Sequence, residues 1–194
     1  MKTDIILAGV GGQGILSIAA VIGMAATGSE LFVKQAEVHG MSQRGGAVQS
    51  HLRLSDKPVY SDLIPRGECD LILSVEPMEA LRYVPYLSAT GWIISNSSPF
   101  INIDDYPDKM ALEEAYNALD NSILIDADSI ASSLGSKRAS NMVILGAASN
   151  KLGISFKALE DSIRSIFGPK GEEVVKLNLD ALESGRKVAD GDAS

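Results

Sequence analysis

A glycine-rich turn between a predicted strand and a predicted helix is the feature that most restricts the fold of this chain. The stretch "DIILAGV" (4–10) is a short apolar run, and "GILSIAAVIGMAATG" (14–28) is apolar on nearly all sides. The first is typical of a buried strand, and the second of a helix that is buried on most of its surface. Between them, Gly9, Gly11 and Gly14 form a GxGxxG motif. Because glycine lets the backbone turn tightly, we expect the chain to begin with a strand, a turn and a helix.

Strand-like and helix-like stretches alternate along the rest of the chain. Predicted strands cover 30–38, 46–55, 70–75, 91–98 and 122–128, with 59–64 as a return strand that forms a hairpin with 46–55. Predicted helices cover 77–87, 110–120, 140–153, 155–167 and 172–188. We therefore expect an α/β fold, a Rossmann-like three-layer sandwich with a mostly parallel sheet, strand 4–10 at its centre and a helical C-terminal region. Residues 1–188 are expected to form a single domain and 189–194 a disordered tail.

The charge and the cysteine content exclude several classes of protein. The formal net charge of −8 argues against non-specific binding to nucleic acid or to an anionic membrane. Cys69 is the only cysteine, so the sequence excludes an internal disulfide, a self-contained iron–sulfur cluster and a thiolate zinc site. The apolar run 15–26 is shorter than the roughly 20 residues that span a bilayer. We expect a cytoplasmic protein.

The glycine-rich turn is a candidate phosphate-binding loop. Ligands of parallel sheets bind beyond the carboxyl ends of the strands, and a helix N-terminus offers free main-chain amides to a phosphate. Gly12 and Gln13 add a further glycine and a side-chain amide. Alternatively, the glycines serve only the close packing of the strand against the helix. Binding of NAD is not supported, because Glu37, the acid nearest to the end of the second strand, opens a polar loop that it could instead cap or orient.

That polar loop, "AEVHGMSQRGG" at 36–46, is a second candidate site. Gly45 and Gly46 let the backbone expose its amides, and Arg44 offers a permanently charged fork for a carboxylate or a phosphate. His39 could exchange protons near neutral pH, although a lone histidine is more often a structural hydrogen-bonding residue. No second His or Cys stands at ligand spacing, so no metal site is predicted. No pair of nucleophile and base is recognisable either.

Together, "GVGGQGILSIAAVIGMAA" and "AEVHGMSQRGGAVQSHLRLS" resemble the gamma-type domain of the 2-oxoacid:ferredoxin oxidoreductases. The resemblance continues through "PVYSDLIPRGECDLILSVEPMEALR" and "NMVILGA", and it spans about residues 3–185. The words "EVHGM" and "LIPRGECDLILSVEPMEALR" are similar to the indolepyruvate branch, in which the domain is a separate small (beta) subunit. The resemblance implies oxidative decarboxylation of an aryl pyruvate, with coenzyme A as acyl acceptor and ferredoxin as electron acceptor.

The resemblance also implies that parts of the enzyme lie on another chain. Thiamine diphosphate and iron–sulfur clusters are expected on a larger alpha subunit, because this chain has neither a set of cysteines nor a recognisable thiamine-binding motif. The chain is expected to be inactive alone, to complete the active site and to bind coenzyme A. Neither nucleic acid nor a membrane is expected as a partner.

The residues expected to bind the cofactor all belong to the two glycine-containing loops. They are Gly9, Gly11, Gly12, Gln13, Gly14, Gln43, Arg44, Gly45 and Gly46. No catalytic residue is assigned to this chain alone, with His39 as the one candidate, and no metal ligand is expected. Three alternatives stay open: a gamma subunit that serves pyruvate, 2-oxoisovalerate or 2-oxoglutarate, a stand-alone NAD(P)-binding oxidoreductase, and a purely structural assembly subunit.

Overall fold

Strand β1 (Lys2–Val10) lies inside the sheet, as its unbroken apolar sequence predicts. The side chains of Ile5, Ile6 and Leu7 are fully buried. Ile5 and Leu7 belong to the hydrophobic core on one face of the sheet, and Ile6 belongs to a second core on the opposite face. Alternate side chains of a strand point to opposite faces, so β1 is covered on both sides. The expected central position of this strand is confirmed.

The computed structural model describes residues 1–39 and 46–191. These residues form one six-stranded sheet in the order β2-β3-β1-β4-β5-β6. β1 pairs in parallel with β4, β4 with β5 and β5 with β6, whereas β3 is antiparallel to both β1 and β2. The sheet is therefore mixed, and β3 is the strand that runs against its neighbours. The other strands are β2 (Phe32–His39), β3 (Ala47–Ser55), β4 (Cys69–Ser74), β5 (Leu87–Asn96) and β6 (Ser122–Ile125).

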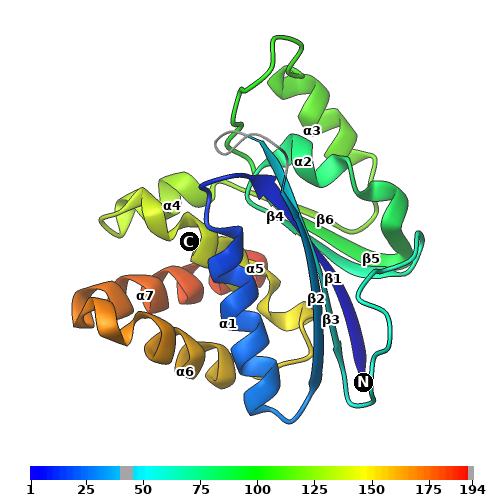
Figure 1. Cartoon of the computed structure of the whole chain (residues 1–194). Coiled ribbons are helices and arrows are strands. Elements are labelled where there is room, and N and C mark those ends of the chain that lie inside the picture. Colours follow the sequence, from blue (N-terminus) through cyan, green and yellow to red (C-terminus); the bar gives the residue numbers. More distant parts are fainter. Residues whose placement is uncertain (40–45, 192–194) are drawn as a thin grey trace.

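Helices cover both faces of this sheet (Figure 1). The larger core lies on the face that carries α1, α4, α5, α6 and α7, and the smaller core lies on the face of α2 and α3. The three-layer α/β fold with a helical C-terminal region is confirmed. The bounds of the helices are α1 (Ile15–Gly28), α2 (Pro77–Leu81), α3 (Lys109–Asn117), α4 (Ala127–Ser133), α5 (Ser140–Ala148), α6 (Phe156–Phe167) and α7 (Glu172–Ala189).

Several predicted elements end early, and for two of them the local cause is visible. The helix predicted at 77–87 stops at Leu81 and gives way to a 3₁₀ turn, Val84–Tyr86, in which proline cannot continue the α-helical hydrogen bonds. The strand predicted at 122–128 stops at Ile125, because the next residue already caps a helix. The carboxylate of that residue, Asp126, accepts a hydrogen bond from the amide of Ser129 at 3.0 Å, and so begins α4, which sequence analysis did not predict.

The prediction of a return strand at 59–64 is wrong. The segment between β3 and β4 contains no strand, and side chains hold it instead of a ladder of backbone bonds. The guanidinium of Arg53 donates to the carbonyl oxygens of Ser61 and Leu63, at 3.2 and 2.9 Å. It also pairs with the fully buried carboxylate of Asp4 at 2.8 Å. The segment is therefore fastened to β1 and β3 through one arginine.

His51 on β3 fastens the same segment a second time. Its Nδ1 accepts a hydrogen bond from the amide of Ile64 at 3.0 Å, and its ring meets the ring of Tyr86 edge to face. Burial of the imidazole, followed by the nearby charge of Arg53, lowers the pKa of His51. The ring is thus kept neutral, which is the form that can accept this hydrogen bond.

We expect the free energy of unfolding to fall as the pH drops below about 6.5, the usual histidine pKa. Just below this pH, His51 becomes protonated in the unfolded chain but stays neutral in the folded one. The contribution of His51 to stability is therefore fully present above the pKa of the unfolded state, and it is lost as the pH falls toward the lower pKa of the folded state. Urea unfolding between about pH 5 and pH 7.5 measures this slope. His51→Gln should flatten it, and an unchanged slope in that variant would contradict the assignment.

Helices α5 and α7 pack closely against each other at two glycines. A Cβ on Gly146 of α5 would lie 1.9 Å from the carbonyl oxygen of Leu182. A Cβ on Gly185 of α7 would lie 1.9 Å from the carbonyl oxygen of Val143. Each helix therefore places a glycine against the backbone of the other, and no larger residue fits at either position.

Gly146→Ala is expected to lower the free energy of unfolding by about 3 kcal/mol, because the added methyl group meets a backbone oxygen that cannot rotate away. Gly23→Ala in α1 is the matched control, since nothing lies within 4 Å of its added Cβ. That change should stabilise the chain by about 0.5–1 kcal/mol through the better helix propensity of alanine. Chemical denaturation of both variants compares them, and equal stabilities would speak against the close crossing.

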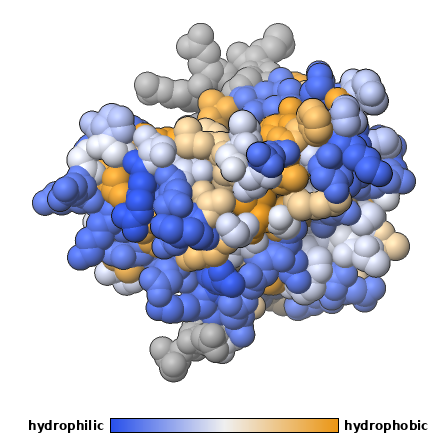
Figure 2. Space-filling view, turned by 90° about the horizontal axis from the view of Figure 1, so that it is seen from below, coloured by the Kyte–Doolittle hydropathy of each residue, from blue (hydrophilic) through white to orange (hydrophobic). Residues whose placement is uncertain are grey.

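No helix in the described part of the chain is long and apolar enough to cross a membrane. The most apolar candidate from sequence analysis, the run at 15–26, lies in α1, which has 14 residues. Hydrophilic side chains predominate on the face of the molecule seen from below, with apolar side chains gathered toward its middle (Figure 2).

Candidate functional site

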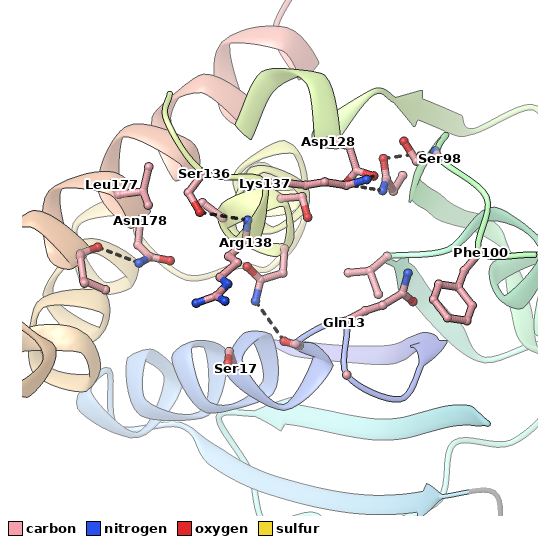
Figure 3. Close-up of a pocket in the computed structure, with 18 of the residues that line it drawn as sticks. Gln13, Ser17, Ser98, Phe100, Asp128, Ser136, Lys137, Arg138, Leu177 and Asn178 are labelled. Carbon is pink, nitrogen blue, oxygen red and sulfur yellow. Dashed lines mark hydrogen bonds and ion pairs between the residues drawn. The ribbon is translucent and has the colours of Figure 1, made fainter. Parts of the chain in front are cut away.

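A cavity of about 850 Å³ opens at the edge of the sheet where the parallel strands end (Figure 3). The helix after β1 covers one face of the sheet and the helix after β4 covers the other. Sheets with this arrangement bind ligands at the carboxyl ends of two such strands. Each parallel strand contributes lining from its carboxyl end. These residues are Gly12 after β1, Val75 after β4, Asn96 at the end of β5 and Asp128 after β6. The cavity lies where the fold predicts a ligand.

Two glycines of the turn are required by the backbone itself. Gly12 and Gly14 have φ angles of +98° and +85°, which disfavour any residue with a Cβ. A Cβ on Gly14 would also lie 2.6 Å from Nδ2 of Asn141 on α5. That nitrogen donates a hydrogen bond to the carbonyl oxygen of Gly14 at 3.1 Å. The glycine turn is thereby joined to α5.

Other members of the turn have a structural role. The side-chain oxygen of Gln13 accepts a hydrogen bond from the amide of Val10 at 2.8 Å. The amide of Gly11 donates to the carbonyl oxygen of Gly46 at 2.9 Å. A Cβ on Gly9 would lie 2.5 Å from a methyl group of Val75, so this glycine serves close packing. Gly9, Gly11 and Gln13 therefore shape the turn. For Gly9 this agrees with the alternative prediction that the glycines serve close packing.

The remaining amides of the turn are available to a ligand. Within residues 1–39 and 46–191, the amides of Gly12, Gly14, Ile15 and Leu16 have no protein acceptor. The first amides of a helix have no partner inside the helix, and the helix dipole makes this end attractive to negative charge. An anionic group in the cavity can therefore accept hydrogen bonds from the amides of Gly12 and Gly14, just before α1.

Basic side chains from distant parts of the chain also line the cavity. Lys137 pairs with Asp128 at 3.0 Å, and the ammonium of Lys170 lies 5.1 Å from the ring centroid of Phe167. Arg138 has no carboxylate within ion-pair distance among the described residues. Its guanidinium points into the cavity between α1 and α7 (Figure 3). Sequence analysis missed these residues, and the signal was the basic pair in "GSKRASN", just before a buried helix.

Asn141 contributes an acceptor to the same cavity. Its side chain is 6% exposed, and its Oδ1 has no hydrogen-bond partner in the described part of the chain. A buried polar atom without a partner is destabilising, so this oxygen is suited to receive a donor from a bound molecule. The cavity thus offers donors for an anion and an acceptor for a hydroxyl or amino group.

The structure places only part of the predicted site. Gly9, Gly11, Gly12, Gln13 and Gly14 form the turn beside the cavity, and Gly46 is hydrogen-bonded to it. Gln43, Arg44 and Gly45 lie outside the described residues, and so does the side chain of the candidate catalytic residue His39.

Glu37 is separated from the glycine turn by a strand. It lies on β2, and β3 stands between β2 and β1 in the sheet. Adjacent strands are about 4.8 Å apart, which puts β2 roughly 10 Å from β1 in the plane of the sheet. In dinucleotide-binding folds the acid that binds the ribose ends the strand next to β1. Glu37 does not occupy that position.

Comparison with known proteins finds relatives over nearly the whole chain. The family model for pyruvate ferredoxin/flavodoxin oxidoreductase matches residues 4–188. Indolepyruvate oxidoreductase subunit IorB of Pyrococcus horikoshii is 36% identical, over 96% of this chain and 95% of its own. 2-Oxoglutarate synthase subunit KorC of Methanothermobacter marburgensis is 26% identical, over 97% of each chain. The fold also matches the 2-oxoglutarate:ferredoxin oxidoreductase from Magnetococcus marinus, solved with 2-oxoglutarate, coenzyme A and succinyl-CoA bound. That match has a TM-score of 0.78 at 24% identity and covers 98% of this chain but 31% of the longer one.

Proposed function

Because the chain belongs to the pyruvate ferredoxin/flavodoxin oxidoreductase family, we propose that it is the small subunit of a ferredoxin-dependent enzyme that oxidises indolepyruvate or a similar aryl pyruvate. The higher identity to an indolepyruvate oxidoreductase subunit, 36% against 26% for a 2-oxoglutarate synthase subunit, supports this substrate class. In the reaction the 2-oxoacid loses carbon dioxide and its acyl group forms a thioester with coenzyme A. Two electrons pass to ferredoxin, and the thiol proton is released.

The redox cofactors of this reaction belong on a larger partner subunit. Thiamine diphosphate supplies the carbanion chemistry and iron–sulfur clusters carry the electrons. Cys69, the only cysteine of the sequence, is buried, and burial raises the pKa of its thiol to about 12. An iron–sulfur cluster requires several thiolates, so the donor set of this chain does not fit one.

The role of this chain itself is to hold coenzyme A in the cavity. The observation that carries this proposal is that Gly12, Gly14 and Arg138 line the same cavity. Among the described residues, the two glycine amides have no acceptor and the guanidinium has no carboxylate partner. Coenzyme A carries a pyrophosphate and a separate phosphate, so the amides would bind one and Arg138 the other. Asn141 Oδ1 would accept a hydrogen bond from a hydroxyl or amino group of the ligand. The volume of about 850 Å³ is within the usual range of ligand sites, about 300–1,000 Å³.

The loop 36–46 is proposed to complete the same site. The hydrogen bond from the Gly11 amide to Gly46 fastens the described end of this loop to the glycine turn. Arg44 would then bind a phosphate or the substrate carboxylate, with Gln43 and Gly45 beside it, and His39 is retained as a candidate proton carrier.

A stand-alone NAD(P)-binding enzyme is the weaker alternative. Glu37 lies on β2, which β3 separates from β1, so it does not stand where such an enzyme has its ribose ligand. A gamma subunit for pyruvate, 2-oxoisovalerate or 2-oxoglutarate would share the same cavity, and kinetics of the whole complex with each 2-oxoacid decides between these substrates.

Calorimetric titration of the chain with coenzyme A tests the cavity. Arg138→Gln should weaken binding by about 1.5–3 kcal/mol, or roughly 10- to 150-fold, because a hydrogen bond to a charged phosphate is lost. Arg164→Gln is the matched control, since Arg164 is exposed on α6 and lies outside this cavity. NADH should not bind. Absence of coenzyme A binding by the folded wild-type chain would favour a purely structural subunit.

Arg44 is tested in the complex reconstituted with the larger subunit. Arg44→Ala should lower kcat/KM for coenzyme A or for the 2-oxoacid. The expected loss corresponds to about 1.5–3 kcal/mol of transition-state stabilisation. Arg44→Lys should not restore it, because lysine keeps the charge but lacks the planar fork. Steady-state kinetics that vary each substrate separately show which one Arg44 serves. Changes below about threefold in both variants, with the subunits still associated, would assign Arg44 to the surface.

A further inference from the structure

An apolar patch lies beside the mouth of the cavity, on the segment that joins β5 to α3 and on the first turn of α3. We define this rim patch as Phe100, Ile101, Ile103 and Met110, whose exposed fractions are 41%, 73%, 43% and 79%. Phe100 also lines the cavity (Figure 3), and Ile101 follows it directly in the chain. Asp104 and Asp105 are exposed next to the patch and add a polar margin.

The segment that carries the rim patch is fastened by a buried carboxylate. Residues 97–108 form neither helix nor strand. Glu76, which is fully buried and caps α2, accepts hydrogen bonds from the amide of Phe100 at 3.2 Å and from the hydroxyl of Tyr106. It also accepts one from the amide of Glu79 at 2.7 Å.

These bonds hold the segment in one position. No Lys or Arg in the described chain forms an ion pair with Glu76, so hydrogen bonds are its polar contacts. Loss of these bonds by a buried carboxyl group is strongly unfavourable. Phe100 and Tyr106, which flank Ile101 and Ile103 in the chain, are thereby tied to the same carboxylate. A surface that is ordered before binding loses less conformational entropy when a partner arrives.

We propose that the rim patch is the surface on which the larger, thiamine-carrying subunit docks. This inference rests on the proposed function: the thiol of coenzyme A in the cavity must reach an acyl group held on a cofactor of the other chain. The other chain must therefore approach the mouth of the cavity, where Phe100 of the rim patch is part of the lining. Aromatic and methionine side chains are enriched, and charged ones depleted, in the centre of protein interfaces, with polar residues at the margin.

The test replaces the two rim residues that lie outside the cavity lining. Ile101→Gln combined with Met110→Gln should weaken association with the larger subunit, purified from the native host, at least tenfold in a titration followed by analytical ultracentrifugation. Coenzyme A binding by the variant chain should stay within twofold of wild type, because neither residue lines the cavity. The matched control is Tyr60→Gln combined with Leu63→Gln, at two exposed apolar residues on the segment between β3 and β4. The control should associate normally.

A second variant tests the fastening of the segment. Tyr106→Phe removes the hydroxyl that reaches Glu76 and keeps the ring, and it should weaken association by a smaller factor than the double rim variant. The proposal is overturned if the double rim variant associates within twofold of wild type. It is also overturned if the patch proves to join two copies of this chain, seen as a dimer that the rim variant dissociates while the larger subunit still binds. A wild-type chain that associates but binds no coenzyme A would refute the function of the cavity and leave the docking surface standing.

Discussion

The close contact between α5 and α7 at Gly146 and Gly185 sets the shape of the cavity. Asn141, in the first turn of α5, lies beside the glycine turn, and α7 lines the far side with Leu177 and Asn178. Because the two backbones touch at the glycines, their separation cannot be adjusted by repacking side chains. The basic turn before α5 is held between these helices, with the guanidinium of Arg138 directed inward. The helical layer thus determines the geometry of a site whose recognisable motif lies at the end of a strand.

The sequence predicts best the elements whose signal is local. β1 and α1 were recognisable because an apolar strand, a glycine turn and an apolar helix follow one another without interruption. α4 was missed because it is short, and its start depends on one capping residue, Asp126. The prediction of a return strand at 59–64 was wrong because the side chains of Arg53 and His51 hold that segment in an irregular conformation. Both side chains come from another element, and a local pattern does not reveal them.

The same distinction applies to the site. The glycine motif predicts a turn that binds phosphate, and in the structure the glycine turn lies at the cavity. Which residues of the turn have a structural role was not predictable, because Gly11 and Gln13 act through hydrogen bonds to Gly46 and Val10. The basic turn with Arg138 comes from more than a hundred residues away in sequence, and it meets α1 only because the C-terminal helices fold back over the same face of the sheet.

The position of β3 has a consequence for folding during synthesis. In the described sheet β2 pairs only with β3, and β3 separates it from β1. A nascent chain that ends at residue 39 therefore has β1, α1 and β2 but no means of joining its two strands. The missing partner is complete only at Ser55, the end of β3. At typical rates of about 5–20 residues per second, the ribosome needs roughly one to three seconds to supply it. For that interval both strands expose unpaired edges, which is the state in which a chain is open to chaperones or to misassembly.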